Sequence, residues 1–175
     1  LRNEKRYSPR LLKRRDAKST GAMQAKNRTN KTFEECINNH SSYLITGGAG
    51  GLGLKLAEQL IRAGAGQVIL LGRSKFGPDI GKNINSITSD GNQLKYHQVD
   101  ISDEHAIMTL LQTLVLGELS IKGIFHLAGV VDDGTLTEQT WDKFETVYSP
   151  KVYGAINLHN CSQKRNLELD YFVLF

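Results

Sequence analysis

The segment from Thr46 to Gly53 constrains the fold more than any other part of the sequence, because five of its eight residues are glycine. It follows a short apolar run, Tyr43 to Thr46, and precedes a helical pattern of apolar residues from Leu52 to Ile61 that ends before Gly64. Glycines at such a junction let the backbone turn sharply and approach a ligand without Cβ atoms in the way. The free N–H groups of the helix start then point toward an anion. The sequence therefore predicts a strand, an anion-binding loop and a helix.

The glycines of this loop have a spacing with a specific meaning. Gly48, Gly50 and Gly53 form G-x-G-x-x-G, which is typical of dinucleotide-binding folds when a strand precedes it and a helix follows it. A glycine-rich turn that binds nothing is the alternative interpretation. We expect a dinucleotide diphosphate to lie here, and the predicted cofactor-binding residues of the loop are Thr46, Gly47, Gly48, Ala49, Gly50, Gly51, Leu52 and Gly53.

Strand and helix patterns alternate along the rest of the chain. Strands are predicted at residues 67–71, 94–99, 121–127 and 171–175, and helices at residues 80–87, after Ser102 and from about Glu138 to Cys161, with a turn at Ser89-Asp90-Gly91. Such strands are parallel and joined by right-handed crossovers. The strand at 67–71 lacks alternating polar residues, so helices should cover both faces of the sheet. The predicted fold is a Rossmann-like, doubly wound α/β sheet of about five strands, incomplete because the sequence stops on a strand.

The helix after the third predicted strand shows start signals and one apolar face. Ser102 is the expected N-cap, and acids in the first turn favour the positive end of the helix dipole. The residues expected on the buried face have i, i+4, i+7, i+8 spacing. They are Ile107, Leu111, Leu114 and Val115.

The first 40 residues differ from the rest in charge and pattern. Residues 1–31 contain eleven Lys and Arg against two acids, a charge of +9, whereas residues 32–175 contain eleven against sixteen, a charge of −5. Residues 1–40 have no sustained apolar period and are interpreted as a basic, irregular linker or the end of a preceding subdomain. Lys13-Arg14-Arg15 would suit nucleic acid or an acidic partner, but no aromatic platform accompanies it, so nucleic-acid binding is not expected. The folded domain is predicted at 41–175.

Composition excludes several other classes of protein. The longest uncharged apolar runs have the length of strands, so no membrane span is expected. Leu1 to Arg6 is charged and no apolar stretch follows, so no signal peptide is expected. Cys36 and Cys161 are far apart without Cys-x-x-Cys spacing. This argues against a metal site or a disulfide framework and favours a reducing, cytoplasmic setting.

The end of the second predicted strand bears on the choice of cofactor. An NAD site normally has an acid there, about twenty residues after the glycine loop, to accept hydrogen bonds from the ribose 2′-hydroxyl. This sequence has Gly72-Arg73-Ser74 instead. Arg73 offers a permanently charged planar fork to a 2′-phosphate, and Ser74 adds a hydroxyl donor. NADPH is therefore expected rather than NADH, with an ordinary surface arginine as the alternative for Arg73.

These motifs resemble the short-chain dehydrogenase/reductase family, whose loop T-G-x-x-x-G-x-G is matched by Thr46, Gly47, Gly51 and Gly53. More closely, residues 41–175 resemble the ketoreductase domain of a modular polyketide synthase, with animal-type fatty acid synthase as a near relative. The segments that carry this resemblance are residues 43–54, 70–74, 99–100, 126–130, 150–154 and 169–175. Residues 5–10 are similar to the end of the noncatalytic half that precedes such a reductase.

The resemblance implies roles for further residues. Asp100 would lie beside the adenine, and Ala128 and Gly129 would let the cofactor ribose pass close to the fourth strand. His126 would be a packed side chain rather than a catalyst. Lys151 would be catalytic, because a cation near the reacting tyrosine lowers the pKa of its phenol. The residues alone also allow a turn at position 100, helix–strand packing at 128–129 and a solvated lysine at 151.

Val131-Asp132-Asp133 occupies the position of a Leu-Asp-Asp tripeptide in the family. That tripeptide accompanies B-type ketoreductases, which give D-3-hydroxyacyl products. Asp132 and Asp133 are therefore expected to influence product stereochemistry, although the same residues would also form a polar turn.

The remaining catalytic residues of the family have no counterpart in this sequence. The serine and the Tyr-x-x-x-Asn pair would come after Phe175, so we expect the chain as given to be inactive alone. Tyr153 and Asn157 have the same spacing but follow Lys151 too closely, and we interpret them as a coincidental match.

The resemblance implies a ketoreductase that transfers hydride from NADPH to the β-keto carbon of an acyl thioester, as part of a multifunctional synthase. The substrate would be attached through phosphopantetheine to an acyl carrier protein, the main partner besides the other domains of the synthase. The basic leader would attract this acidic carrier protein. Two alternatives stay open: a nucleotide-binding structural domain without turnover, and a freestanding reductase of a small alcohol.

Overall fold

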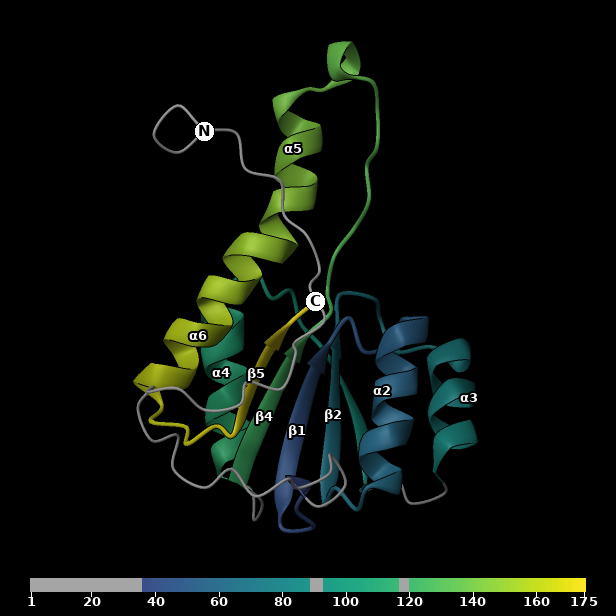
Figure 1. Cartoon of the computed structure of the whole chain (residues 1–175), viewed down its shortest axis with the longest axis vertical. Coiled ribbons are helices and arrows are strands. Elements are labelled where there is room, and N and C mark those ends of the chain that lie inside the picture. The colour runs from purple at the N-terminus through teal and green to yellow at the C-terminus, as the bar shows by residue number, and fades with distance from the viewer. Residues whose placement is uncertain (1–35, 89–92, 117–119) are drawn as a thin grey trace, which may run out of the picture. The chain divides into compact units, whose positions relative to one another are not determined.

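The computed structural model describes residues 36–88, 93–116 and 120–175, and these contain five parallel strands in one sheet, in the order β3-β2-β1-β4-β5 (Figure 1). The strands are β1 (Ser41–Thr46), β2 (Gln67–Gly72), β3 (Leu94–Gln98), β4 (Ser120–His126) and β5 (Tyr171–Leu174). Each agrees with its predicted position within three residues. Residues 1–35 of the predicted leader, with Lys13-Arg14-Arg15, and the predicted turn Ser89-Asp90-Gly91 lie outside the described residues.

Helices cover both faces of this sheet, which confirms the doubly wound prediction. They are α2 (Gly51–Arg62), α3 (Pro78–Ile87), α4 (Glu104–Val115), α5 (Trp141–Tyr148) and α6 (Gly154–Lys164), with a 3₁₀ turn η1 (Leu136–Glu138) and a π-helical segment η2 (Ser149–Tyr153). Helices α2 and α3 lie on one side of the sheet, and α4 and α6 on the other (Figure 1). In the described part of the chain, no helix is both long and apolar enough to cross a membrane.

Strand β1 lies at the centre of the sheet and divides the core. All six of its residues are buried, and successive side chains enter opposite faces. Leu44 packs with residues of α4 and α6, whereas Tyr43 and Ile45 pack with residues of α2 and α3. Full burial of one such aliphatic side chain contributes about 1.5–3 kcal/mol. The core thus fixes the carboxyl end of β1, from which the glycine loop departs.

Helix α4 begins one residue later than predicted. Its N-cap is Asp103, whose carboxylate accepts hydrogen bonds from the backbone N–H groups of His105 (2.9 Å) and Ala106 (3.1 Å). Ser102, the predicted cap, donates its hydroxyl to Asp100 at 2.6 Å instead. Serine and aspartate both cap helices well. Here the Ser102 hydroxyl is bound to the Asp100 carboxylate, so Asp103 caps the helix instead.

Apolar side chains at the helix ends are less buried than their spacing predicts. Leu52, at the start of α2, is 61% exposed, and Val115, at the end of α4, is 45% exposed. Ile107 and Leu111 are buried as predicted. Terminal turns reach past the edges of the sheet, so periodicity alone overestimates their burial.

The long helix predicted from about Glu138 to Cys161 is present, but it starts three residues later and is less regular than predicted, since it runs without a break through α5, η2 and α6. Thr140 caps α5 through its hydroxyl, which accepts from the N–H of Lys143, and Pro150 then falls inside the helical run. Proline has no N–H to donate and its ring crowds the preceding turn. The backbone widens there into η2, where the N–H of Gly154 donates to the carbonyl of Ser149. Such π-helical insertions are frequent at functional sites.

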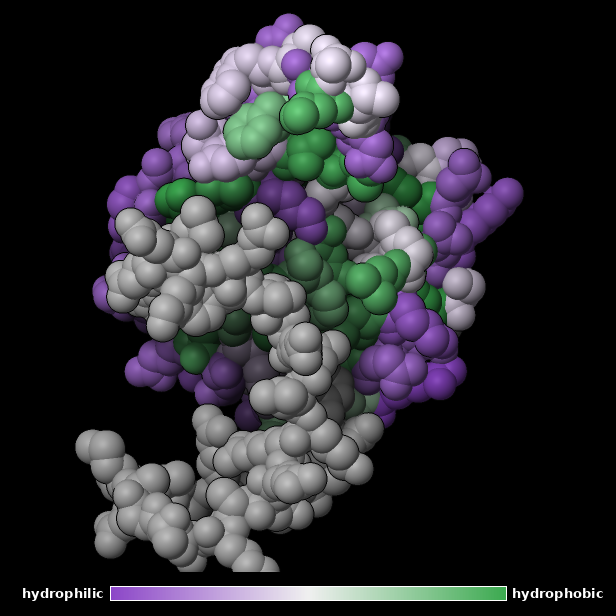
Figure 2. Space-filling model, turned by 45° about the horizontal axis from the view of Figure 1, so that its top comes forward, coloured by the Kyte–Doolittle hydropathy of each residue, from purple (hydrophilic) through white to green (hydrophobic). Residues whose placement is uncertain are grey.

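Helix α5 projects beyond the sheet and carries a row of aromatic rings. Trp141 is 71% exposed and stacks on Phe144 with centroids 5.1 Å apart, and Phe144 stacks on Tyr148 at 5.2 Å. Figure 2 shows hydrophobic side chains exposed among polar ones on the face turned to the viewer. The described residues therefore leave α5 less covered than α2, α4 or α6.

Candidate functional site

The loops that follow the parallel strands meet at the carboxyl edge of the sheet. A cavity of about 110 Å³ lies there, below the ends of β1, β2 and β4. It is lined by Gly47, Leu71, Gly72, Arg73, Val99, Ile101, Ala128, Gly129 and Pro150. Four of the residues predicted to bind a cofactor are therefore brought together, although they come from three separate segments of the sequence. Ligands of doubly wound folds bind at this edge.

The glycine loop is packed so closely that side chains are excluded. Gly47 has a φ of +66°, and a Cβ there would lie 2.9 Å from the backbone N and Cα of Ala128. A Cβ on Gly53 would lie 2.6 Å from the carbonyl oxygen of Gly47. A Cβ on Gly48 would lie 2.7 Å from the Leu70 side chain. These three glycines therefore shape the loop itself.

Gly51 differs from these three glycines, because a Cβ there would meet no atom within 4 Å. It is the first residue of α2. The N-cap, Gly50, has no side chain that could cap the helix, and the first turn contains no acidic residue. The first N–H groups of a helix have no partner within the helix and carry about half an elementary positive charge. This exposed helix start fits a diphosphate group, which needs N–H donors and room for close approach.

Arg73 and Ser74 follow the end of β2. Their backbones are fixed by hydrogen bonds, whereas both side chains are exposed. Their carbonyl oxygens accept hydrogen bonds from β3: Gln98 Nε2 donates to Arg73 at 3.0 Å, and the Tyr96 hydroxyl donates to Ser74 at 2.6 Å. A Cβ on Gly72 would lie 2.7 Å from that hydroxyl. A larger side chain at position 72 would therefore displace Tyr96, whereas the Arg73 side chain is exposed to solvent.

Asp100 lies at the turn after β3 and interacts electrostatically with Arg73. Partial burial raises the pKa of its carboxyl group, but hydrogen bonds from Ser102 and the positive charge of Arg73 outweigh this, and the pKa is lowered overall. The two bonds come from the backbone N–H of Ser102 at 2.9 Å and from its hydroxyl at 2.6 Å. The carboxylate is thus ionised and held as an acceptor beside Arg73.

A second, open groove of about 770 Å³ runs from Arg73 and Asp100 along α4. His97 of β3 and Thr109 of α4 lie on its walls. Partial burial and the charge of Lys95 lower the pKa of His97, which favours its neutral form. Arg73 and Val99 border both this groove and the smaller cavity.

Lys151 lies in η2 and reaches across the end of β4 to the end of β5. Its Nζ donates to the carbonyl oxygen of Phe175 at 2.8 Å. Its Cε would be 2.5 Å from a Cβ on Gly129, so the lysine chain lies directly over the Gly129 backbone. The predicted catalytic cation is therefore adjacent to the cavity that the predicted cofactor residues line.

Two buried polar side chains connect these loops, and only one of them was predicted to belong to the site. Thr46 is fully buried, and its hydroxyl oxygen accepts from the N–H of Ala128 at 3.1 Å. The same hydroxyl lies 2.7 Å from Nδ1 of His126. Thr46 therefore joins β1 to β4 and presents no side chain to a ligand. The signal for His126 was a polar residue directly after the apolar pair Ile124-Phe125 at the end of the strand.

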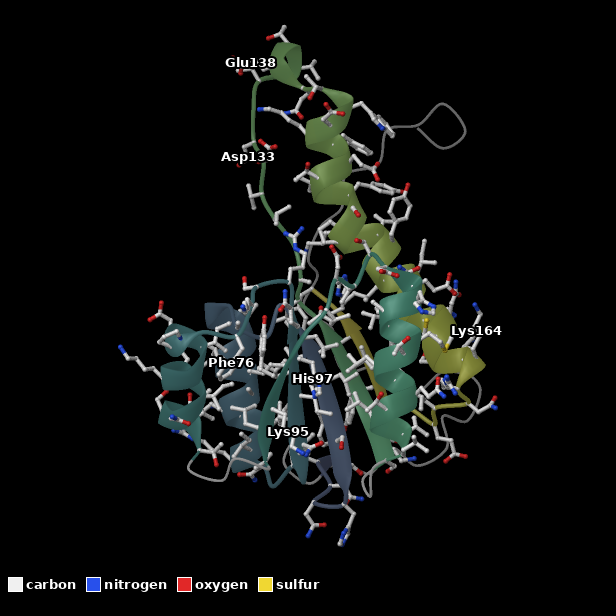
Figure 3. All side chains as sticks on the ribbon, turned by 180° about the vertical axis from the view of Figure 1, so that it is seen from behind. Phe76, Lys95, His97, Asp133, Glu138 and Lys164 are labelled. Carbon is white, nitrogen blue, oxygen red and sulfur yellow. The ribbon has the colours of Figure 1, made fainter. Side chains whose placement is uncertain are left out.

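The remaining candidates lie apart from the cavity. Asp133 projects from the segment that rises beyond the sheet, well away from His97 on β3 (Figure 3). Asp132 is paired with Lys143 of α5 at 3.5 Å. The side-chain amide of Asn157 donates to the carbonyls of Ile101 and Ser102, which gives it a structural role. Among the described residues, no group of three potential metal ligands occurs.

The sequence model of the family described as "KR domain" matches residues 41–175, which contain the glycine loop, Arg73 and Lys151. The chain belongs to the KR domain family. Its relatives and structural neighbours include ketoreductases of polyketide synthases, which agrees with the resemblance carried by the sequence motifs.

The similarity of this KR chain extends to both sequence and structure. A phthioceranic/hydroxyphthioceranic acid synthase of Mycobacterium tuberculosis is 37% identical over 134 residues, which cover 77% of this chain and 6% of the synthase. A ketoreductase domain from the bacillaene assembly line has a TM-score of 0.72 and 33% identity, over 78% of this chain and 33% of that chain. An N-terminal ketoreductase from the macrolactin assembly line has a TM-score of 0.71 and 33% identity, over 79% of this chain and 28% of that chain. The KR chain thus spans a small fraction of its curated relative.

Proposed function

We propose that this KR domain takes part in the NADPH-dependent reduction of a β-ketoacyl thioester to a 3-hydroxyacyl thioester in polyketide biosynthesis. The observation that carries the proposal is the meeting, at one sheet edge, of a side-chain-free glycine loop, an arginine at the end of β2 and a lysine at the end of β5. The first two suit a phosphorylated dinucleotide, and the third adds a cation beside the reacting centre.

The residues present fit NADPH. The open N-terminus of α2 at Gly51 would hold the diphosphate, and the guanidinium of Arg73 would hold the 2′-phosphate. Gly47 and Gly129 line the cavity next to Lys151, and the nicotinamide ribose would pass close to them. The nicotinamide supplies the hydride when it is bound.

Lys151 has the chemical role in this proposal. Its ammonium group lies at the end of β5, where it would stabilise negative charge on a carbonyl oxygen that accepts hydride. The same positive charge would lower the pKa of a neighbouring phenol and so favour proton donation. Asp132 and Asp133, on the segment after β4, are proposed to face the acyl chain and to favour the D-configured product.

The substrate is proposed to be tethered through phosphopantetheine to an acyl carrier protein of the same synthase, in the cytoplasm. Such tethering raises the effective concentration of the substrate at the site. The first 35 residues, with their excess of positive charge, are proposed to favour encounter with an acidic carrier protein.

The test is a pair of measurements on the full-length protein. Binding of NADPH and of NADH is followed by the change in nicotinamide fluorescence, and reduction of a β-ketoacyl N-acetylcysteamine thioester by the loss of absorbance at about 340 nm. We expect tighter binding of NADPH and turnover of the thioester, with a D-configured product by chiral chromatography. Equal affinity for the two nucleotides would contradict the cofactor assignment, and NADPH binding without turnover would favour a structural, noncatalytic domain.

A further inference from the structure

His126 is a deeply buried titratable side chain near the site, and both its ring nitrogens have partners. It lies at the end of β4 and is 2% exposed. Nδ1 is 2.7 Å from the Thr46 hydroxyl, and Nε2 is 3.3 Å from the backbone carbonyl oxygen of Lys151. One imidazole therefore contacts the strand that carries the glycine loop and the segment that carries the lysine.

The partners determine which nitrogen carries the proton. The carbonyl of Lys151 can only accept, so Nε2 must be the N–H of the neutral ring. Nδ1 is then an acceptor, and the Thr46 hydroxyl donates a hydrogen bond to it. The Thr46 oxygen in turn accepts from the N–H of Ala128, which can only donate. All four groups are satisfied by one directional chain from Ala128 through Thr46 and His126 to Lys151.

The packing around His126 holds the ring in this position. A Cβ on Gly154 would lie 2.6 Å from Ile101 and 3.4 Å from Cε1 of His126, so the start of α6 rests closely on the ring. Burial lowers the pKa of His126, while the hydrogen bond to Lys151 opposes this, and the net pKa is below its usual value. The neutral ring that the hydrogen bonds require is therefore also the favoured form.

We propose that His126 is a positioning residue, which fixes the backbone of η2 relative to the glycine loop and thereby directs the Lys151 ammonium to the end of β5. The inference rests on the proposed function in those tests that measure activity, and it is independent of that function in the structural test. In a regular α-helix each carbonyl accepts from the N–H four residues later, whereas in η2 the carbonyl of Ser149 accepts from the N–H of Gly154, five residues later. His126 supplies a donor to this irregular segment from outside the helix.

Three substitutions in the full-length protein separate the two contacts. His126→Gln places an amide near the position of Nε2 and keeps a donor for Lys151, whereas His126→Asn reaches only the position of Nδ1 and keeps the contact with Thr46. His126→Phe keeps the volume and loses both. We expect kcat to fall about 10- to 100-fold in His126→Asn and His126→Phe. His126→Gln should recover most of that loss, and the Kd for NADPH should change less than twofold in His126→Asn.

A double-mutant cycle tests whether the effect passes through Lys151. In a Lys151→Met background, His126→Asn should lower kcat no further. The matched control is His159→Asn, an exposed histidine on α6, which should leave kcat unchanged. Equal losses in the Asn and Gln variants, or an undiminished loss in the Lys151→Met background, would overturn the proposal.

Crystal structures of the wild type and the variants test the positioning role of His126 without depending on enzymatic activity. If the wild type binds no NADPH or reduces nothing, the function fails, but the geometry of η2 can still be compared between wild type and His126→Asn. We expect Lys151 Nζ to leave the Phe175 carbonyl in that variant and to remain there in His126→Gln. An unchanged η2 in both variants, or in His126→Gln and His126→Phe if the Asn variant does not fold, would refute the positioning role.

Discussion

The two sides of the carboxyl edge are held in place by different means. On the glycine side, formed by the loop after β1 and the end of β2, backbone packs directly on backbone, and Cβ atoms added to Gly47, Gly48 or Gly53 would come within 3 Å of it. On the lysine side, formed by the ends of β4 and β5 with η2, one exposed side chain is placed by hydrogen bonds from other elements. Under the proposed function, binding of the cofactor would therefore depend on the path of the backbone, whereas catalysis would depend on the position of one lysine side chain.

The largest expected effect concerns the lysine side. Lys151→Met should lower kcat by about 100- to 1,000-fold, because it removes the positive charge that is proposed to act at the reacting centre. The Kd for NADPH should change little, since the glycine side is intact. The measurement is steady-state kinetics with a β-ketoacyl thioester, combined with fluorescence titration of NADPH.

The matched control for this variant is Lys164→Met, which removes an exposed lysine that pairs with Glu104 at 2.5 Å on the far end of α6. Exposed pairs contribute about 0.2–1 kcal/mol, so activity should persist. A Lys151→Met enzyme that loses NADPH affinity but keeps kcat would reverse the assignment of the two sides.

Two glycine variants separate the effect of the glycine side on stability from its effect on NADPH binding. Gly47→Ala should reduce the free energy of unfolding by about 1–3 kcal/mol, because its φ is +66° and its Cβ would meet Ala128. Gly51→Ala should leave unfolding nearly unchanged, since the space around it is open. Both should weaken NADPH binding by about tenfold or more, the second through the close approach of the diphosphate. Chemical denaturation and NADPH titration measure the two effects, and normal NADPH binding by Gly51→Ala would refute this placement of the diphosphate.

Arg73→Gln sharpens the comparison by removing charge from the glycine side without touching its backbone. Loss of a charged hydrogen-bonding partner of the 2′-phosphate costs about 1.5–3 kcal/mol, so the Kd for NADPH should rise about 10- to 100-fold. The Kd for NADH should not change. Arg62→Gln, at an exposed arginine on α2, is the control. A parallel loss of affinity for both nucleotides would mean that Arg73 contacts a part common to them.

The smallest expected effect concerns the support of α4. Asp103→Ala should lower the free energy of unfolding by about 1 kcal/mol, because two N–H groups lose their acceptor. Ser102→Ala should cost less, since Ser102 does not cap the helix. Both variants should keep NADPH affinity, and thermal unfolding with a binding titration decides the matter. A larger loss in Ser102→Ala would restore the sequence-based choice of cap.

The glycine side was largely predictable because its determinants are local in sequence. The loop, the flanking strand and helix, and Arg73 lie within about thirty residues, and their chemistry follows from glycine geometry and charge. The support of Lys151 was not predictable in this way. It depends on His126, 25 residues earlier, and on a helical irregularity at Pro150 that spacing alone treats as an uninterrupted helix. The choice between Ser102 and Asp103 as cap likewise depended on a third residue, Asp100.

The strand order is β3-β2-β1-β4-β5. From β1 the chain therefore first adds β2 and β3 on one side of the sheet and then returns to add β4 and β5 on the other. The loops after the neighbouring strands β1 and β4 therefore lead away to opposite sides, and in folds of this topology a crevice lies between two such loops. A molecule that spans this crevice touches both loops at once. Its binding free energy is consequently shared between the two loops.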